Sequence, residues 1–210
     1  QNNNIPDWLF LVQPTSPFLL VKHILSLMTK LQNNPDAIAA YPDWNEIDSL
    51  SRITRTIHLP TYDIKEMLLS LNVSIGPGIL VKKESIKQLE IRDTTLKYAG
   101  DLDFYFQLAL NGRLVHIPEP LATHRIHANA ASTTGKGKEM ANQLVKVIVK
   151  SLGHPNLPPD LYQQRFIIQS KIHHLAANYY SGKDFLSKIK HVVLSEFWRI
   201  IDLFLNKIIS

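Results

Sequence analysis

The sequence contains no cysteine, which excludes disulfides, thiolate metal sites and a cysteine nucleophile. It also lacks an apolar run of the roughly 18 residues that a membrane-crossing helix needs. The first residues, QNNNIPDWLFLV, contain no basic leader and too short an apolar stretch for a signal peptide. With 45% hydrophobic and 20% charged residues in 210, the composition is that of an ordinary globular chain and predicts one domain, or one domain with an appendage.

Positive charge is unevenly distributed along the chain. Residues 136–210 contain 11 Lys and Arg against 5 Asp and Glu, whereas residues 1–135 contain 12 against 13. A basic segment of this kind either binds an acidic partner or forms a solvated face. We expect no nucleic-acid partner.

The first two-thirds of the chain alternate short apolar runs with helical patterns, which predicts an α/β fold with a sheet and flanking helices. Continuous or alternating apolar runs predict strands at 8–12, 37–41, 79–81 and 113–117, the last ending at Pro118. Residues 42–44 are expected to form a loop, and residues 45–59 irregular structure or a small hairpin. Helical periodicity predicts helices at 16–32, 62–71, 83–90 and 101–110. Residues 136–210 form an α-helical extension, with helices near 139–152, 158–179 and 183–209. The expected division is therefore 1–135 and 136–210.

Two acidic residues open the predicted helix at 101–110. A helix N-terminus stabilises negative charge, so Asp101 and Asp103 are favourable there. They either cap the helix or provide a catalytic base. Residues two apart at a helix start diverge, so one can cap while the other reacts.

Two further segments are candidates for ligand binding. Arg125 and His127 follow a strand, and guanidinium and imidazole groups suit a diphosphate or a metal; alternatively they are polar residues at a strand end. The turn Gly76-Pro77-Gly78 is either a plain turn or a place where a ligand approaches the backbone.

The order of these segments resembles the acceptor half of a family-2 glycosyltransferase. The stretch GPGILVKKESIKQLEIRDTTLKYAGDLDFYFQLALNGRLVHIPEPLATHRIHANAAST follows that family's order: a G-P-G-like turn, E-D-x-D-L, I-P-E-P-L and R-x-H. The upstream NPDAIAAYPDWNEID is similar to the strand and loop after the family's sugar-nucleotide site. The resemblance implies a GT-A fold and an inverting transfer of sugar from a nucleotide-sugar to a saccharide or lipid-linked acceptor.

The resemblance also implies roles for individual residues. Asp101 matches the general base that deprotonates the acceptor hydroxyl, and Asp103 the second acid of the same motif. Arg125 and His127 match the pair that faces the donor diphosphate or its metal. The acceptor pocket would be formed by Asp43, Trp44, Gly76, Pro77 and Gly78.

The sequence departs from the family in two places. Gly100 replaces the glutamate of the E-D motif, and no acid is present among residues 13–16, where the D-x-D metal motif is expected. A divalent cation, manganese or magnesium, would then be held weakly, with His127 as its best ligand. The family's donor-binding N-terminal half is not in this sequence, so the chain is expected to be a fragment or to have lost donor binding.

Two other interpretations compete. A degenerate, non-catalytic domain that binds a saccharide or a partner accounts for the missing acids. A sugar-activating cytidylyltransferase is suggested by LVQPTSPF, which is similar to that family's LLQPTSPLR, although Leu19 stands at the arginine.

The last predicted helix is amphipathic, with lysines and an arginine among broad apolar residues. Residues 183–210 therefore either bind an anionic membrane surface or pack on the preceding helix. We expect a cytoplasmic protein that is peripheral on the inner membrane face.

Overall fold

A computed structural model of the chain describes residues 8–11, 21–87, 89, 93–126, 137–180 and 184–209, with the backbone alone at 8–11, 208 and 209. The chain forms two compact units. Unit 1 consists of Gln1–Asp63, Val73–Ile91 and Gln107–Thr133. Unit 2 consists of Ile64–Asn72, Arg92–Phe106 and Thr134–Ser210. The C-terminal helices thus share their unit with two short segments from earlier in the chain.

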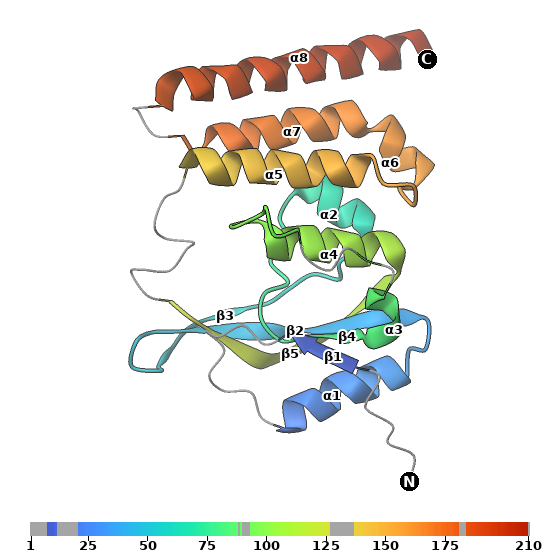
Figure 1. Cartoon of the computed structure of the whole chain (residues 1–210), viewed down its shortest axis with the longest axis vertical. Coiled ribbons are helices and arrows are strands. Elements are labelled where there is room, and N and C mark those ends of the chain that lie inside the picture. Colours follow the sequence, from blue (N-terminus) through green and yellow to red (C-terminus); the bar gives the residue numbers. More distant parts are fainter. Residues whose placement is uncertain are drawn as a thin grey trace. The chain divides into compact units, whose positions relative to one another are not determined.

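Unit 1 contains a mixed sheet (Figure 1). Its described strands are β1 (Trp8–Leu11), β2 (Ala37–Ile47), β3 (Ile53–Ile57), β4 (Ile79–Lys82) and β5 (Arg113–Arg125). β5 runs parallel to β2 along its whole length, so β4 and β3 share the opposite edge of β2, both antiparallel to it. β1 pairs antiparallel with β4.

The apolar pattern located four of these strands, all but β3, and two of the four extend well beyond the expected bounds. Pro42, Asp43 and Trp44 belong to β2 and not to a loop, and β5 continues beyond Pro118. The pairing register explains this, because Pro42 is opposite Ile117 while Asp43 is opposite Pro120. Residues 118 and 119 of β5 are left out of the register, so Pro118, which lacks an N–H, lies outside the paired positions of the ladder.

Helix α1 (Val21–Gln32) packs on the sheet of unit 1 (Figure 1). Leu27 and Leu31 are fully buried in one apolar cluster with small and branched residues of the strands: Ala37, Ala40, Leu80, Val115, Ile117 and Leu121. Burying a leucine side chain contributes about 1.5–3 kcal/mol. This packing fixes β2 and β5, the two strands that contain the candidate site residues Asp43, Trp44 and Arg125.

The segment expected to be irregular or a small hairpin is a hairpin of β2 and β3. Arg55 of β3 forms a bidentate ion pair with Glu46 of β2, with bonds of 3.0 and 2.8 Å. The turn is closed by Asp48, which accepts from the amides of Leu50 and Arg52. The helix expected at 83–90 is shorter: α3 covers Lys83–Ile86, and Lys87 is its C-cap.

Unit 2 is helical. It contains α2 (Ile64–Ser70), α5 (Gly137–Leu152), α6 (Pro159–Gln163), α7 (Arg165–Ala177) and α8 (Phe185–Ile209). Helix α4 (Gly100–Asn111) has residues 100–106 in unit 2 and 107–111 in unit 1. The helix expected at 158–179 is divided at Gln164, whose ψ of 6° departs from helical geometry. Within the unit, α7 lies against α5 and α8 (Figure 1). None of the helices in the described ranges is both long and apolar enough to cross a membrane.

Candidate active site

A buried carboxylate lies between two histidines in unit 1. Asp43, in the middle of β2, is 1% exposed. Its Oδ2 lies 2.8 Å from His58 Nδ1 and its Oδ1 lies 2.7 Å from His116 Nε2. The backbone amide of Leu59 donates to Oδ1 at 2.9 Å. Three chain segments, β2, β5 and the residues after β3, therefore meet at one carboxylate.

The ionisation of Asp43 fixes the hydrogen-bonding roles of its partners. Burial alone would raise the pKa of Asp43, but the bonds from Leu59, His58 and His116 outweigh it and hold the pKa below its usual 3.8. An ionised carboxylate only accepts hydrogen bonds, so His58 donates through Nδ1–H and His116 through Nε2–H. The His58 side chain is 76% exposed, so the cluster presents one oriented imidazole to solvent.

Tyr41 connects this cluster to the loop that follows β3. Its hydroxyl donates to the Pro60 carbonyl at 2.8 Å and accepts from the Tyr62 amide at 2.7 Å. Its ring stacks on His116 at a centroid distance of 5.1 Å. Burial is the main cause that raises the pKa of Tyr41, so its hydroxyl stays a donor. The loop that contains His58 is held at both ends.

The glycine turn of the expected acceptor pocket packs closely against β2 and β5. Trp44 is 9% exposed and donates through Nε1 to the Ser74 carbonyl at 3.2 Å. Gly76 has a φ of +67°, and a Cβ there would lie 2.6 Å from Trp44 Nε1. Gly78 has a φ of +89°, and a Cβ would lie 2.8 Å from that of Ala122. Backbone conformation and space both require glycine at these positions. Pro77 between them is buried.

Arg125, at the end of β5, is bonded to the β2–β3 turn. Nη1 donates to the Asp48 carbonyl at 2.6 Å and Nη2 to Ser51 Oγ at 2.9 Å. Ser51 has a φ of 64°, a left-handed conformation that such bonds help to hold. The guanidinium is thus fixed in place, with further N–H groups on its fork. His127, its expected companion, lies outside the described residues.

The two acids at the start of α4 lie in unit 2 and differ in environment. Asp101 is exposed, and its Oδ1 accepts from the Leu102 amide at 2.8 Å. Asp103 is 1% exposed, and Lys150 of α5 donates to its Oδ2 at 2.9 Å. Asp103 Oδ1 has no hydrogen-bond partner among the described residues. Of the two, Asp101 has the carboxylate that solvent can reach.

Sequence reasoning missed three of these residues: His58, His116 and Lys150. The histidines that bind Asp43 are 15 and 73 positions away from it, and Lys150 is 47 positions from Asp103. No spacing rule connects residues so far apart. Only the alternation of residues 113–117, which places His116 on one face of a strand, was a usable signal.

The described residues contain no group of three His, Asp or Glu side chains that could hold a metal ion. Both oxygens of Asp43 are used by the histidines and the Leu59 amide. The residues in the described part therefore do not fit a divalent cation, and we derive no step through one.

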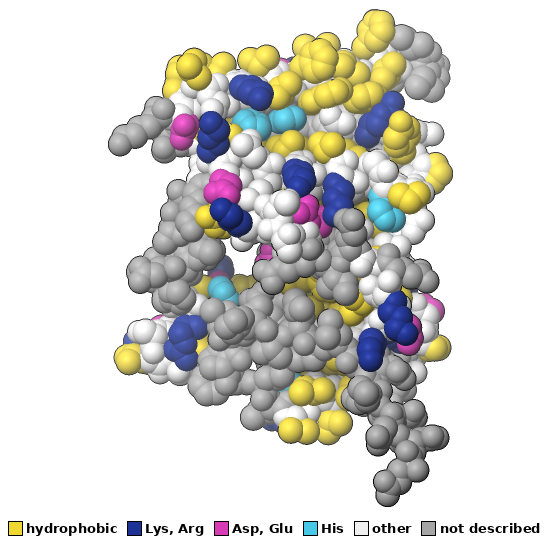
Figure 2. Space-filling model, in the orientation of Figure 1, with side chains coloured by type: hydrophobic (Ala, Val, Ile, Leu, Met, Phe, Trp, Pro, Cys, Tyr) yellow, Lys and Arg dark blue, Asp and Glu magenta, His cyan; other side chains and the backbone are white. Residues whose placement is uncertain are grey.

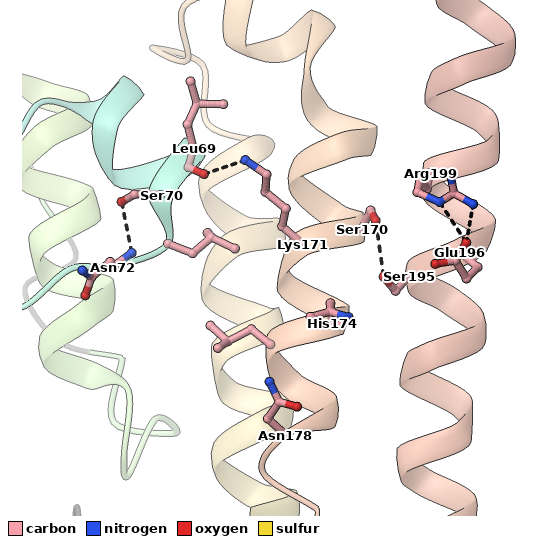
Figure 3. A pocket seen from close by; sticks show the side chains of 12 residues that line it. Leu69, Ser70, Asn72, Ser170, Lys171, His174, Asn178, Ser195, Glu196 and Arg199 are labelled. Atoms are coloured by element: carbon pink, nitrogen blue, oxygen red, sulfur yellow. Dashed lines mark hydrogen bonds and ion pairs between the residues drawn. The ribbon is translucent and has the colours of Figure 1, made fainter.

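Unit 2 has an open pocket of about 590 Å³ (Figure 3). Its polar groups interact largely with one another: Lys171 donates to the Leu69 carbonyl, and Arg199 pairs with Glu196. Ser170 and Ser195 lie 3.3 Å apart, Oγ to Oγ, at its edge. Because Lys171 and Arg199 already have a hydrogen-bond or ion-pair partner among the lining residues, the pocket does not indicate a particular ligand.

The comparisons with known proteins concern the fold. No family model matches the sequence, and no curated protein matches it. The structure is similar to the crystal structure of residues 1–349 of TarS from S. aureus, with a TM-score of 0.51 and 9% sequence identity. The match covers 92% of this chain and 66% of that one. The fold is therefore mixed α/β and similar to that of TarS. TarS, the protein it resembles, is a glycosyltransferase.

Proposed function

We propose that the chain is the acceptor-side part of a glycosyltransferase with a GT-A-like sheet, related to family 2. It would transfer a sugar from a nucleotide-sugar to a saccharide or lipid-linked acceptor. The observation that supports this most is the fold similarity to TarS over 92% of the chain. Since the chain spans only 66% of that structure, the donor, the acceptor and the catalytic roles are all parts of the proposal.

In this proposal Asp101 is the general base. Its carboxylate is exposed at the start of α4, where it can take the proton of an incoming hydroxyl while the sugar–diphosphate bond breaks with inversion. Asp103 is a less favourable base, because it is buried and bonded to Lys150. We assign Asp103 to holding the start of α4 against α5, which positions Asp101.

The departing diphosphate requires positive charge. Arg125 is suited to this, since its bonds to Asp48 and Ser51 fix the guanidinium in advance and leave further donors for phosphate oxygens. His127 follows two residues later and is proposed as its companion. A manganese or magnesium ion, if used, would have His127 as its ligand in this sequence.

The acceptor side is proposed to lie around Trp44 and the turn Gly76-Pro77-Gly78. Asp43 belongs to this region but is 1% exposed, so it would act as a positioning residue through His58. The exposed His58 ring is then the group that faces a saccharide hydroxyl.

The test is turnover by the Asp101→Asn protein in an assay that detects nucleotide release from a panel of nucleotide-sugars. Removal of a general base costs about 100- to 10,000-fold in rate, while donor affinity and unfolding should stay unchanged because Asp101 is exposed. Asp160→Asn is the matched control, since Asp160 is an exposed acid of unit 2. A loss of less than about threefold in Asp101→Asn would restrict Asp101 to helix capping.

A second candidate function is a non-catalytic saccharide-binding domain. Two of the acids that could serve chemistry, Asp43 and Asp103, are fully buried and bonded to cationic or imidazole partners, which favours a structural role for both. This alternative predicts saccharide binding that Asp101→Asn leaves intact, with no nucleotide release from any donor.

A further inference from the structure

Helix α8 places buried hydrogen-bonding groups on its side toward α7. Its His191 Nδ1 lies 2.8 Å from His173 Nδ1, and Ser195 Oγ lies 3.3 Å from Ser170 Oγ. Further along, Trp198 stacks on Phe166 at a centroid distance of 5.5 Å. His191 and Ser195 are each 5% exposed. The side of α8 toward α7 therefore combines buried hydrogen-bonding groups with half-buried apolar residues: Leu194, Trp198, Ile201 and Leu205.

The outward side of α8 is apolar. Figure 2 shows hydrophobic side chains gathered along this helix. Leu186 is 82% exposed and Phe204 is 64% exposed, and six of the apolar residues between them are also exposed: Ile189, Val192, Val193, Phe197, Ile200 and Leu203. Together with Phe185, at 61%, these residues form what we call the α8 strip. In water a helix normally has the opposite arrangement, with its apolar side against the protein.

Basic residues border the α8 strip. At 3.6 residues per turn, the strip covers an arc of about 140°. The exposed Lys188 and Arg199 lie along one border of this arc, and the exposed Lys190 lies along the other. Two charged residues fall inside the arc, Glu196 and Lys207. Glu196 and Arg199 form an ion pair, with a distance of 2.7 Å between Oε2 and Nη2, so their charges cancel. The net positive charge at the borders therefore comes from Lys188 and Lys190.

We propose that the α8 strip binds the surface of an anionic lipid bilayer, with α8 lying in the plane of the interface. An apolar arc with basic borders is the pattern of an interfacial helix, in which apolar side chains enter the headgroup region and lysines meet lipid phosphates. Unit 2 supplies further attraction, since it contains 14 Lys and Arg against 9 Asp and Glu. This proposal does not depend on sugar transfer.

A second copy of the chain fits the α8 strip less well. Two copies of α8 packed strip to strip would bring basic borders together, and like charges at an interface are unfavourable. Lipid phosphates neutralise the same residues. The charge pattern therefore favours a membrane over self-association.

The test is flotation of the full chain with vesicles of phosphatidylcholine alone or with about one third phosphatidylglycerol, at low and high salt. We expect binding to the anionic vesicles at low salt, and weaker binding when salt screens the lysines. Leu186→Asp combined with Phe204→Asp should weaken binding at least about tenfold. Each change removes a large apolar side chain that would be buried in the lipid in the bound state. Lys188→Gln and Lys190→Gln should each cost about fivefold on anionic vesicles only.

The matched control is Val149→Asp on α5, where the residue is 49% exposed; it makes the same chemical change away from α8. All variants should melt at the wild-type temperature, because the altered side chains are exposed. If the double variant unfolds, the single change at Leu186, the most exposed of these residues, replaces it. The proposal is overturned if anionic vesicles do not bind the protein at low salt, or if the α8 variants bind as well as Val149→Asp. It is also overturned if light scattering finds a dimer that these variants dissociate without any vesicle binding.

Discussion

Three aspartates were candidate site residues, and their carboxylates have different environments in the structure. Asp43 is bonded to two histidines and Asp103 to a lysine, and both are 1% exposed. Only Asp101 of the three is exposed. Both oxygens of Asp43 already accept hydrogen bonds. Asp103 has one oxygen bonded to Lys150 and the other buried, so neither carboxylate is open to solvent. The same residue type therefore supports structure at two positions and is available for chemistry at the third.

Adding a single methyl group at Gly76 should lower the stability of the protein. Gly76→Ala places a Cβ 2.6 Å from Trp44 Nε1 and forces alanine to a φ of +67°. The left-handed conformation alone costs roughly 1–2 kcal/mol, and the clash adds to it. We expect the free energy of unfolding to fall by about 2–4 kcal/mol, measured by urea denaturation.

Gly153→Ala is the control for this change. A Cβ at Gly153 would have its nearest neighbour, the Lys150 carbonyl, at 3.6 Å, so stability should be unchanged or slightly higher. Equal stability of the two variants would contradict the close packing of the glycine turn on Trp44.

For single residues, the sequence indicated some of the positions that are important, but not the residues with which they are in contact. Gly76 and Gly78 were recognised as a turn from their spacing. Their closeness to Trp44 and Ala122 depends on the pairing of β2 with β5, which no local pattern contains. For the same reason the two histidines around Asp43 could not be found.

Among the elements, strands and helices followed their hydrophobic periodicity, and the errors occurred where register or pairing overrides it. Proline predicted the end of β5 at Pro118, yet the strand continues to Arg125, because a register shift leaves Pro118 outside the paired positions. Helix α8 was expected with its apolar side either on α7 or on a membrane. Its exposed strip shows that the broad apolar side does not lie on α7.

The contact between α7 and α8 should depend on pH. Burial, and then the neighbouring His191 and Lys190, lower the pKa of His173 from 6.5 to about 4. Burial and Lys190 also lower the pKa of His191, whose Nε2 lies 3.0 Å from the Tyr180 hydroxyl. Below about pH 6.5 the unfolded chain binds protons that the folded chain does not, so stability falls as the pH is lowered toward 4.

Between about pH 7.5 and about pH 5, His173 should account for about 1–2 kcal/mol of lost stability. Other groups also titrate, so the measurement is the difference between the wild type and His173→Gln in urea midpoints at both pH values. The variant should lose less stability on acidification. His174→Gln is the control, because His174 is exposed on the same helix. An identical pH response in the wild type and His173→Gln would exclude this histidine pair as the titrating element.

For the whole molecule, net charge follows the two units. Unit 1 contains 9 Lys and Arg and 9 Asp and Glu, so the net charge of +5 belongs to unit 2. The sequence located the basic excess correctly in the last third of the chain. It did not indicate that Ile64–Asn72 and Arg92–Phe106 join that part, because assignment to a unit depends on tertiary packing.

The two units share helix α4, and this should make their unfolding cooperative. Residues 100–106 of the helix belong to unit 2 and 107–111 to unit 1, and buried side chains occur in both parts, including Phe104 and Leu108. Unfolding of either unit removes partners from one continuous helix, and helix formation is itself cooperative. We therefore expect a single thermal transition near neutral pH.

The Trp8→Phe, Trp198→Phe variant tests this cooperativity, because it leaves Trp44, in β2 of unit 1, as the only tryptophan. Its fluorescence reports unit 1, whereas far-ultraviolet circular dichroism is dominated by helices, which lie mainly in unit 2. Coincident midpoints are the mark of a two-state transition, and this is the expected result. Gly76→Ala should lower both midpoints together, although its clash lies in unit 1. If the fluorescence midpoint shifts while the circular dichroism midpoint does not, the two units unfold independently. The two parts of α4 would then unfold separately, each with its own unit.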